Sequence, residues 1–281
     1  MDHSSLLSSA RPLIERALGE DVGPSDRTSE VTIPPDVQGS ATIVAKAEGV
    51  ICGLPIAQAV FRHVDAHIAF SPSVQDGEPV AAGDAVAEVR GPVRGILTGE
   101  RTALNFLARL SGVATLTSRF VDAVANYPAI VLDTRKTTPG WRVLEKYAVR
   151  CGGGRNHRMG LFDMVLIKDN HIACVGSLAE AVRRVRAAGV DLPVEVEVRS
   201  LAELEEALDL GVDRVLLDNM DMPTLRRAVA LAKGEAFLEA SGGVNLARAT
   251  KVAATGVDAI SIGALTHSAP AFDLSLELTR P

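Results

Sequence analysis

The chain has 281 residues, 47% of them hydrophobic and 23% charged, so it is long enough for two domains or for one barrel with an additional domain. The net charge of −6 argues against nucleic acid as the main partner, and no apolar run approaches the roughly 18 residues of a membrane span. The first residues lack the basic and apolar regions of a secretory signal, so we expect a cytoplasmic protein.

The first hundred residues predict an antiparallel sheet with a helix on one face. Short strands bounded by glycine or proline are indicated within 39–55, 66–74 and 84–91, and apolar residues at helical spacing fill 55–65. This is an α+β pattern, in which one face of the sheet is covered.

A long helix is predicted over 98–127, where an apolar stripe includes Leu104 and Leu107. Arg101 would lie in the first turn of this helix, where a cation opposes the helix dipole. The position is either incidental or kept for a ligand.

The rest of the chain repeats one unit, a short apolar run followed by an amphipathic stretch. The apolar runs lie within 129–136, 163–170, 193–200, 213–220, 236–243 and 258–265. Helical patterns fill 177–190, 200–212, 222–234 and 245–257. Strands that alternate with helices indicate a parallel sheet, and six units in series without a GxGxxG motif favour an α/β barrel over a doubly wound sheet.

In such a barrel the chemistry lies at the carboxyl ends of the strands. Between 133 and 170 there are eight Lys or Arg against four Asp or Glu, which predicts a place for a small anion. The strand ends are cationic first, then acidic, then small and rich in glycine: Arg135, Lys136, Lys168, Asn170; Glu195, Glu197, Asp218, Asn219; Ser241, Gly242, Gly243, Gly263.

The acidic and glycine-rich ends each allow two interpretations. The glycines either bind phosphate through backbone N–H groups or only form tight turns. Glu197 and Asp218 either hold Mg²⁺ or sugar hydroxyls, or are solvated strand ends. Strand alternation places Glu195 and Glu197 on one face, and Glu197 is closer to the strand end.

The cations exceed what one phosphate needs. Arginine forks match carboxylates, so two carboxylates plus a phosphorylated sugar would use the whole group: Arg135, Lys136, His157, Arg158, Lys168. The glycines of the segment "CGGGRNHRMG", residues 151–160, would let it bend over the barrel mouth so that His157 and Arg158 face the ligand, while Arg155 is solvated. Cys52, Cys151 and Cys174 are far apart and odd in number, so neither disulfides nor a zinc site is suggested.

These residues resemble one family. The segments "LDTRKTTPGWRVLEKYAVRCGGGRNHRMGLFDMVLIKDNHI", "VEVEV", "VLLDNM", "LEASGGV" and "SIGALTHSAPAFDLSLEL" are together similar to quinolinate phosphoribosyltransferases, which are also called carboxylating nicotinate-nucleotide pyrophosphorylases. The similarity extends along nearly the whole chain. One departure is Arg199, which follows "VEVEV" where the family often has an acidic or small residue.

The resemblance implies an α/β protein: an incomplete barrel over 109–266 and an N-terminal open sandwich over 1–108, which the tail 267–281 joins. The implied reaction is quinolinate plus phosphoribosyl pyrophosphate giving nicotinate mononucleotide, pyrophosphate and CO₂, with Mg²⁺, in NAD synthesis.

The resemblance also implies roles for named residues. Those expected to hold quinolinate are Arg101, Arg135, Lys136, His157, Arg158 and Lys168. Those expected to hold phosphoribosyl pyrophosphate are Glu197, Asp218, Ser241, Gly242, Gly243 and Gly263. Catalysis would rest on Lys136, Lys168, Glu197 and Asp218, with Glu197 and Asp218 near the metal and Lys168 reprotonating the ring. Arg101 would reach the neighbouring subunit's site in a homodimer.

Two alternatives remain open. A molybdenum-transport-associated homologue shares the "TRKT" and glycine segments, although the intact "IKDNH" favours the quinolinate enzyme. A non-catalytic barrel that binds phosphosugars or dicarboxylates would explain the glycines and cations but not Glu197 together with Asp218.

Overall fold

The structure is a computed structural model that describes residues 3–279, and the chain divides into two compact units. Unit 1 takes in the chain up to Ser118, Thr137–Gly153 and the chain from Leu265, and unit 2 takes in Arg119–Lys136 and Gly154–Ala264. Within 3–279, no helix combines the length and the apolar character that crossing a bilayer requires.

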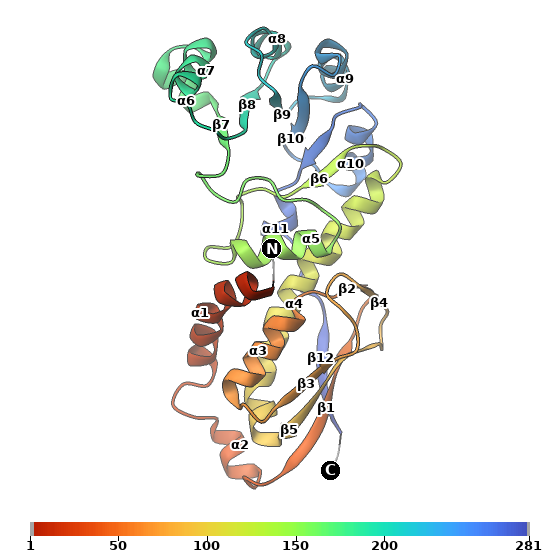
Figure 1. Cartoon of the computed structure of the whole chain (residues 1–281). Coiled ribbons are helices and arrows are strands. Elements are labelled where there is room, and N and C mark those ends of the chain that lie inside the picture. Colours follow the sequence, from red (N-terminus) through yellow and green to blue (C-terminus); the bar gives the residue numbers. More distant parts are fainter. Residues whose placement is uncertain (1–2, 280–281) are drawn as a thin grey trace. The chain divides into compact units, whose positions relative to one another are not determined.

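Unit 1 is built on an antiparallel sheet with the order β12-β1-β5-β3. Its strands are β1 (Gln38–Ala45), β3 (Ala69–Pro72), β5 (Ala85–Pro92) and β12 (Leu274–Thr279), and β2 (Gly49–Val50) pairs with β4 (Pro79–Val80) beside it. The helices α1 (His3–Asp21), α2 (Arg27–Thr32) and α3 (Leu54–Val64) precede the long α4 (Val93–Val124). Figure 1 shows α3 and α4 against one face of this sheet, and Phe61 of α3 stacks on Phe70 of β3 with 6.0 Å between ring centroids. The expected open sandwich is confirmed.

Helix α4 begins earlier than predicted. It starts at Val93, so Arg101 lies two turns inside the helix and the prediction that it occupies the first turn is wrong. The sequence concealed this start because Gly95 lies in the first turn, outside the predicted range. A Cβ on Gly99 would lie 3.0 Å from the ring of Phe61, so glycine permits the close packing of α4 on α3. The helix dipole therefore gives Arg101 no special role.

Helix α5 (Arg142–Cys151) belongs to unit 1. Trp141, just before it, stacks on Phe106 of α4 at 4.8 Å, and Glu145 accepts hydrogen bonds from Arg109 of α4. The compact units therefore differ from the domains expected from the sequence: unit 1 runs to Ser118 and also includes 137–153. These contacts join segments more than 30 residues apart, which no local pattern predicts.

The first of the three glycines after α5 is required for packing. A Cβ on Gly152 would collide with the carbonyl oxygen of Ala114 on α4, so α5 ends against α4 only because this residue is glycine. The same turn brings Cys151 beside Cys52 and Asp76, with their donor atoms within 4.8 Å of one another. Asp76 already accepts hydrogen bonds from the backbone at the start of α3 and from the hydroxyl of Tyr147.

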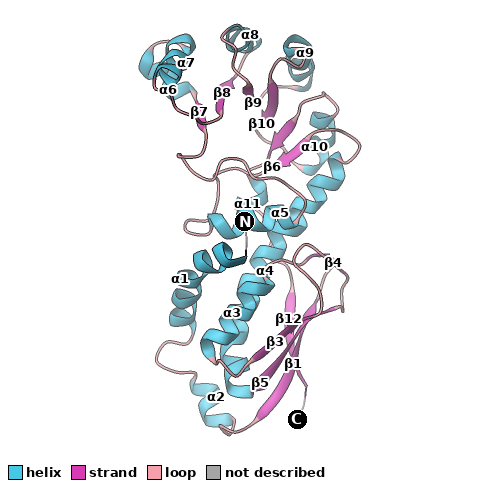
Figure 2. Cartoon of the chain, viewed as in Figure 1, coloured by secondary structure: helices cyan, strands magenta, loops and turns pink. Residues whose placement is uncertain are grey.

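Unit 2 is a six-stranded parallel sheet with the order β6-β11-β10-β9-β8-β7. Its strands are β6 (Ile130–Leu132), β7 (Val165–Ile167), β8 (Val194–Val198), β9 (Arg214–Asp218), β10 (Phe237–Ser241) and β11 (Ala259–Ser261). Its helices are α6 (Asp169–Val175), α7 (Leu178–Ala187), α8 (Leu201–Asp209), α9 (Met222–Ala232) and α10 (Leu246–Ala253), and α11 (Ala264–His267) follows β11. Each predicted strand and helical pattern contains one of these elements. In Figures 1 and 2, α7 to α10 lie outside the strands.

The barrel is open, as expected. The edge strands β6 and β7 do not pair with each other. Beside β6, the chain instead makes one parallel bridge between Leu132 and Arg155. Polar N-caps begin the helices that follow β8 and β9: the side chains of Ser200 and Asp221 each accept a backbone N–H of the first turn. The loops between these strands and the helices that follow are therefore short, and the strand ends face a common space.

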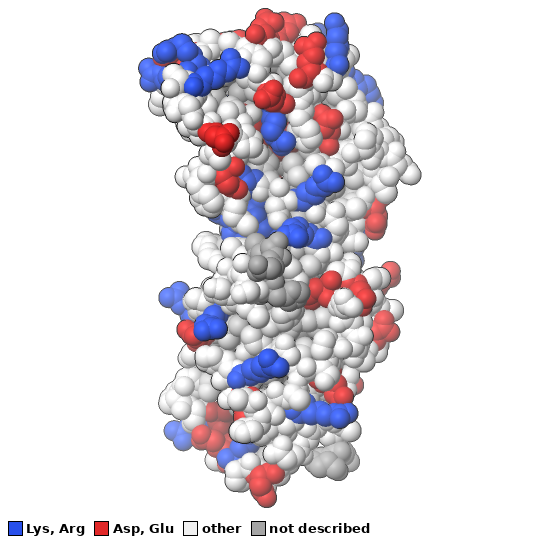
Figure 3. All heavy atoms as spheres, viewed as in Figure 1, with Lys and Arg blue, Asp and Glu red and all other residues white. Residues whose placement is uncertain are grey.

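Charges on the surface are mixed. The face drawn in Figure 3 carries basic and acidic side chains close to one another, without one large patch of a single sign. On α7, for example, Arg183 and Arg184 both pair with Glu180 at 2.7 Å.

Candidate active site

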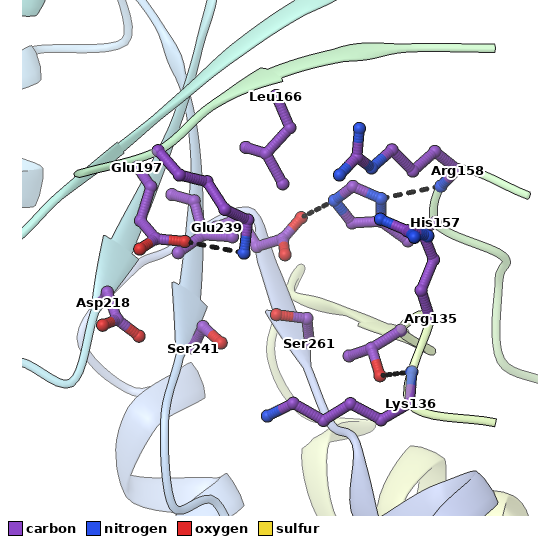
Figure 4. A pocket seen from close by; sticks show the side chains of 13 residues that line it. Arg135, Lys136, His157, Arg158, Leu166, Glu197, Asp218, Glu239, Ser241 and Ser261 are labelled. Carbon is purple, nitrogen blue, oxygen red and sulfur yellow. Dashed lines mark hydrogen bonds and ion pairs between the residues drawn. The ribbon is translucent and has the colours of Figure 1, made fainter. Parts of the chain in front are cut away.

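A cavity of about 470 Å³ lies at the carboxyl ends of the strands of unit 2 (Figure 4). Cationic side chains stand along one side, carboxylates and a serine along the other, and Glu239 and Ser261 between them. The lining residues are Thr134, Arg135, Lys136, His157, Arg158, Leu166, Lys168, Glu197, Leu216, Asp218, Glu239, Ser241 and Ser261.

The cationic side is held by a buried carboxylate that the sequence analysis missed. Asp133, directly after β6, is fully buried; it accepts the backbone N–H of His157 at 2.9 Å and the amide of Asn156 at 2.6 Å. This fixes the segment that carries Arg158 against the strand end that carries Arg135. Burial, and then the charge of Arg135, lower the pKa of the Arg158 guanidinium. A partly buried arginine beside a second cation forms a place for an anion.

The sequence predicted that His157 faces the ligand, but in the structure both nitrogens of its ring make hydrogen bonds within the protein. Its Nδ1 accepts the backbone N–H of Arg158 at 2.7 Å, so Nε2 carries the hydrogen and donates it to Glu195 at 2.9 Å. With both nitrogens engaged and 7% of the side chain exposed, the ring has no free N–H for a carboxylate. His157 lines the cavity and orients Arg158.

The acidic side is made by the ends of two adjacent strands. On β8, Val196 and Val198 are buried on the helix side, and alternation turns Glu197 inward; Asp218 ends β9. The carboxylate of Glu197 pairs with Lys168 at 3.1 Å, and that of Asp218 pairs with Arg199 at 3.4 Å. Two carboxylates at the rim of a polar cavity suit Mg²⁺, which takes oxygen ligands and is commonly held by one or two carboxylates plus substrate phosphates.

Arg199 occupies the position where the sequence departs from the family. Its guanidinium contacts Asp169 at 2.9 Å as well as Asp218, and lies 3.8 Å from Glu197. The charge of Asp169, and then that of Asp218, raise its pKa. Arg199 therefore acts as a counter-cation for the expected metal-binding carboxylates.

The glycine-rich end is less directly exposed to the cavity. Ser241 lines the cavity, whereas Gly242, Gly243 and Gly263 lie in the loops after β10 and β11 and do not contribute to its wall. Gly242 has a φ of 103°, and a Cβ on it would lie 2.9 Å from the Cα of Asn219. The close approach of the neighbouring loop is therefore by itself enough to require glycine at position 242.

Three further polar residues have separate positions. Arg101 is exposed on α4 in unit 1. His171 accepts the backbone N–H of Lys168 at 2.9 Å and so caps α6. Arg155 is exposed, as predicted.

Sequence reasoning missed Glu239 and gave Glu195 no role. Both are fully buried, and Glu239 lines the cavity. Burial, and then the charge of Glu195, raise the pKa of Glu239 to about 7. The signal was present, because alternation places Glu239 on the same face of β10 as Ser241.

Comparisons with known proteins agree with this architecture. The family model for the N-terminal domain of quinolinate phosphoribosyl transferase matches residues 26–111, and the one for its C-terminal domain matches residues 113–277. The chain belongs to the quinolinate phosphoribosyltransferase family. The resemblance seen in the sequence is thereby confirmed.

Relatives in this family are similar over nearly their whole length. A probable carboxylating nicotinate-nucleotide pyrophosphorylase of Synechocystis is 44% identical over 273 residues, which cover 96% of this chain and 92% of that protein. A decarboxylating quinolinate phosphoribosyltransferase of Nicotiana tabacum is 42% identical over 286 residues, which cover 95% of this chain and 81% of that protein. The solved nicotinate-nucleotide pyrophosphorylase of Francisella tularensis has a TM-score of 0.94 at 41% identity, covering 97% of this chain and 96% of that one.

Proposed function

We propose that this chain is a quinolinate phosphoribosyltransferase, which converts quinolinate and 5-phosphoribosyl pyrophosphate to nicotinate mononucleotide, pyrophosphate and CO₂ in NAD biosynthesis. The observation that carries the proposal is the cavity of unit 2, where Arg135 and Arg158 face Glu197 and Asp218. A pyridine dicarboxylate fits the first pair, and a phosphoribosyl group with its metal fits the second. The family relationship supports the same activity.

The cationic side would bind the two carboxylates of quinolinate. Arg135 and Arg158 each offer a planar fork that can bind a carboxylate through two hydrogen bonds. Lys136 extends into the cavity beside them and would lie between the two substrates. His157 keeps its inferred place in the quinolinate site by orienting Arg158 through the 2.7 Å hydrogen bond.

The other side would bind phosphoribosyl pyrophosphate. Glu197 and Asp218 would hold Mg²⁺ directly or through water, and the bound ion would offset the charge of the departing pyrophosphate. Ser241 and the backbone N–H groups at Gly242, Gly243 and Gly263 would receive the 5′-phosphate.

Catalysis would then rest on position and charge. Departure of pyrophosphate leaves an oxocarbenium-like ribose, which Glu197 and Asp218 stabilise electrostatically, while the cationic side holds the pyridine nitrogen against the reacting carbon. Lys168 can shift from Glu197 toward the substrates because 44% of its side chain is exposed. Once the nitrogen is alkylated, its positive charge stabilises the carbanion that loss of the adjacent carboxylate leaves on the ring.

A homodimer completes the proposal. We infer that Arg101 extends the quinolinate site of a neighbouring subunit, because the residue is exposed in unit 1 and the family resemblance assigns it this place. Arg101→Ala subunits mixed with Lys168→Ala subunits should regain part of the activity, since one of the two sites would then be intact. No recovery in verified heterodimers would contradict a shared site.

Incubation with quinolinate, phosphoribosyl pyrophosphate and Mg²⁺ tests the activity. We expect nicotinate mononucleotide, with equal amounts of pyrophosphate and CO₂, and no product when the metal is chelated. Nicotinate, which has one carboxylate, should be a much poorer substrate. Binding without turnover would favour a non-catalytic barrel, and equal use of nicotinate would contradict a site for two carboxylates.

A further inference from the structure

Two buried glutamates meet inside the barrel. Glu195 on β8 and Glu239 on β10 come from alternate strands of the sheet, the arrangement in which barrel side chains share an interior layer. Both side chains are fully buried, yet Glu239 also forms part of the cavity wall, beside Ser261 in Figure 4.

The surroundings provide a hydrogen for only one of these carboxyl groups. His157 Nε2 lies 2.9 Å from Glu195 and 3.4 Å from Glu239, and its single hydrogen is donated to Glu195. The guanidinium of Arg214 on β9 is 3.7 Å from Glu195 and 3.9 Å from Glu239, which is beyond hydrogen-bond distance. The hydroxyl of Ser261 also faces Glu239, but by distance and angle neither oxygen of Glu239 has a hydrogen-bond partner among the described residues.

Two carboxylates this close cannot both stay ionised in a buried site. Glu195 lies within 4.8 Å of Glu239 and receives the hydrogen of His157, which leaves Glu239 as the group that keeps a proton. The raised pKa of Glu239, about 7, agrees with this assignment. Glu239 is therefore a carboxylic acid at the cavity wall, next to Glu195 and Ser261.

The proposed reaction needs such an acid. Loss of CO₂ leaves an electron pair on the ring carbon, and that carbon must gain a proton. Lys168, the donor expected from the sequence, is ion-paired with Glu197 at 3.1 Å. Glu197 lies across the cavity from Arg135 and Arg158. Glu239 lies between the two sides.

We propose that Glu239 is the acid that protonates the ring carbon from which CO₂ departs. This inference rests on the proposed function. The bond between the ring carbon and the leaving carboxylate breaks, and its electron pair stays on the ring carbon. That pair takes the proton of the Glu239 carboxyl group, which becomes a carboxylate. Glu239 regains a proton from water after the product leaves.

A first-turnover experiment on Glu239→Gln tests the inference, because pyrophosphate release reports the first step and CO₂ release the second. We expect pyrophosphate release within a few-fold of the wild type and CO₂ release slowed about 100-fold or more, with ribosylated quinolinate accumulating. Glu235→Gln makes the same chemical change at an exposed position just before β10 and should alter neither step.

The pH dependence gives a second readout that does not need the variant to fold. CO₂ release by the wild type should decline as the pH rises above about 7, where Glu239 loses its proton. The groups that face Glu239 are His157, Glu195, Arg214 and Ser261. The other charged side chains that line the same cavity are Arg135, Lys136, Arg158, Lys168, Glu197 and Asp218. Glu239→Gln should lack this decline.

Three outcomes would overturn the inference: CO₂ release at the wild-type rate in Glu239→Gln, equal slowing of both steps, or a wild-type CO₂ step that stays constant from pH 6 to about 9. None of them is confused with failure of the proposed function, in which the wild type itself would not convert quinolinate and phosphoribosyl pyrophosphate.

Discussion

Each unit of the chain buries a glutamate completely, and the two differ in how they are bound. In unit 1, Glu145 accepts hydrogen bonds from Arg109 at 2.6 and 3.1 Å and from the hydroxyl and backbone N–H of Thr138 at 2.8 and 3.0 Å. In unit 2, Glu239 has no hydrogen bond to either oxygen among the described residues, and it faces a cavity. A buried carboxylate whose oxygens are all hydrogen-bonded stabilises the fold, whereas one without hydrogen bonds at a cavity remains available for chemistry.

The largest expected effect concerns Glu145, the glutamate with hydrogen bonds to both oxygens. Arg109→Met keeps most of the side-chain stem but leaves Glu145 buried without its cation, so the free energy of unfolding should fall by about 3–5 kcal/mol. Urea denaturation measures this. Arg11→Met, at an exposed position of α1, should stay within about 0.5 kcal/mol of the wild type. A loss below about 1 kcal/mol in Arg109→Met would break the comparison.

Substitutions on the cationic side of the cavity should weaken activity strongly and change stability little. Arg135→Ala and Arg158→Ala should each weaken kcat/KM for quinolinate by about 2–5 kcal/mol, because a bound carboxylate loses its partner. The free energy of unfolding should change by less than about 1 kcal/mol. Arg155→Ala, in the same segment but exposed, serves as the control. Near-normal kcat/KM in both variants would remove these arginines from the site.

The pH dependence of stability sharpens the contrast. In the unfolded chain a glutamate has a pKa of about 4.3, whereas Glu239 in the fold has a pKa of about 7. Below the unfolded value both states are protonated and the contribution of Glu239 is fully present. As the pH rises to about 7 the unfolded state ionises first, and the wild type loses up to about 3 kcal/mol relative to Glu239→Gln. A constant difference between the two proteins from pH 4.5 to about 8 would contradict the raised pKa.

The smallest effect concerns the acidic side. Arg199→Ser removes the counter-cation of Asp218, so the Mg²⁺ concentration for half-maximal activity should fall about two- to fivefold, as for an exposed ion pair. Arg183→Ser, which breaks an exposed pair on α7, provides the control. An unchanged or raised Mg²⁺ requirement would mean that Arg199 does not compete with the metal.

The barrel and most of its site were predictable because they follow local periodicity. Apolar runs and N-caps locate the strands and helices of unit 2, and strand ends in a parallel barrel converge, so Arg135, Lys168, Glu197 and Asp218 were expected at one mouth. The cavity brings these four together.

What the sequence did not predict depends on contacts between distant segments. Gly95 in the first turn concealed the start of α4, and the Arg109–Glu145 pair that holds α5 in unit 1 has no local signal. The position of His157 depends on Asp133, which accepts its backbone N–H, and on Glu195, which accepts from its ring, and both contacts are long-range. Glu239 lies inside β10 and not at its end, so the pattern of residues at the strand ends did not include it.

The protonation state of Glu239, compared with that of Glu145, tests the account most directly. Infrared spectroscopy of the wild type near pH 6 should show the carbonyl band of a protonated carboxylic acid that titrates away near pH 7. The band should vanish in Glu239→Gln and persist in Glu145→Gln. A wild-type spectrum without that band, or a band that only Glu145→Gln removes, would contradict the account.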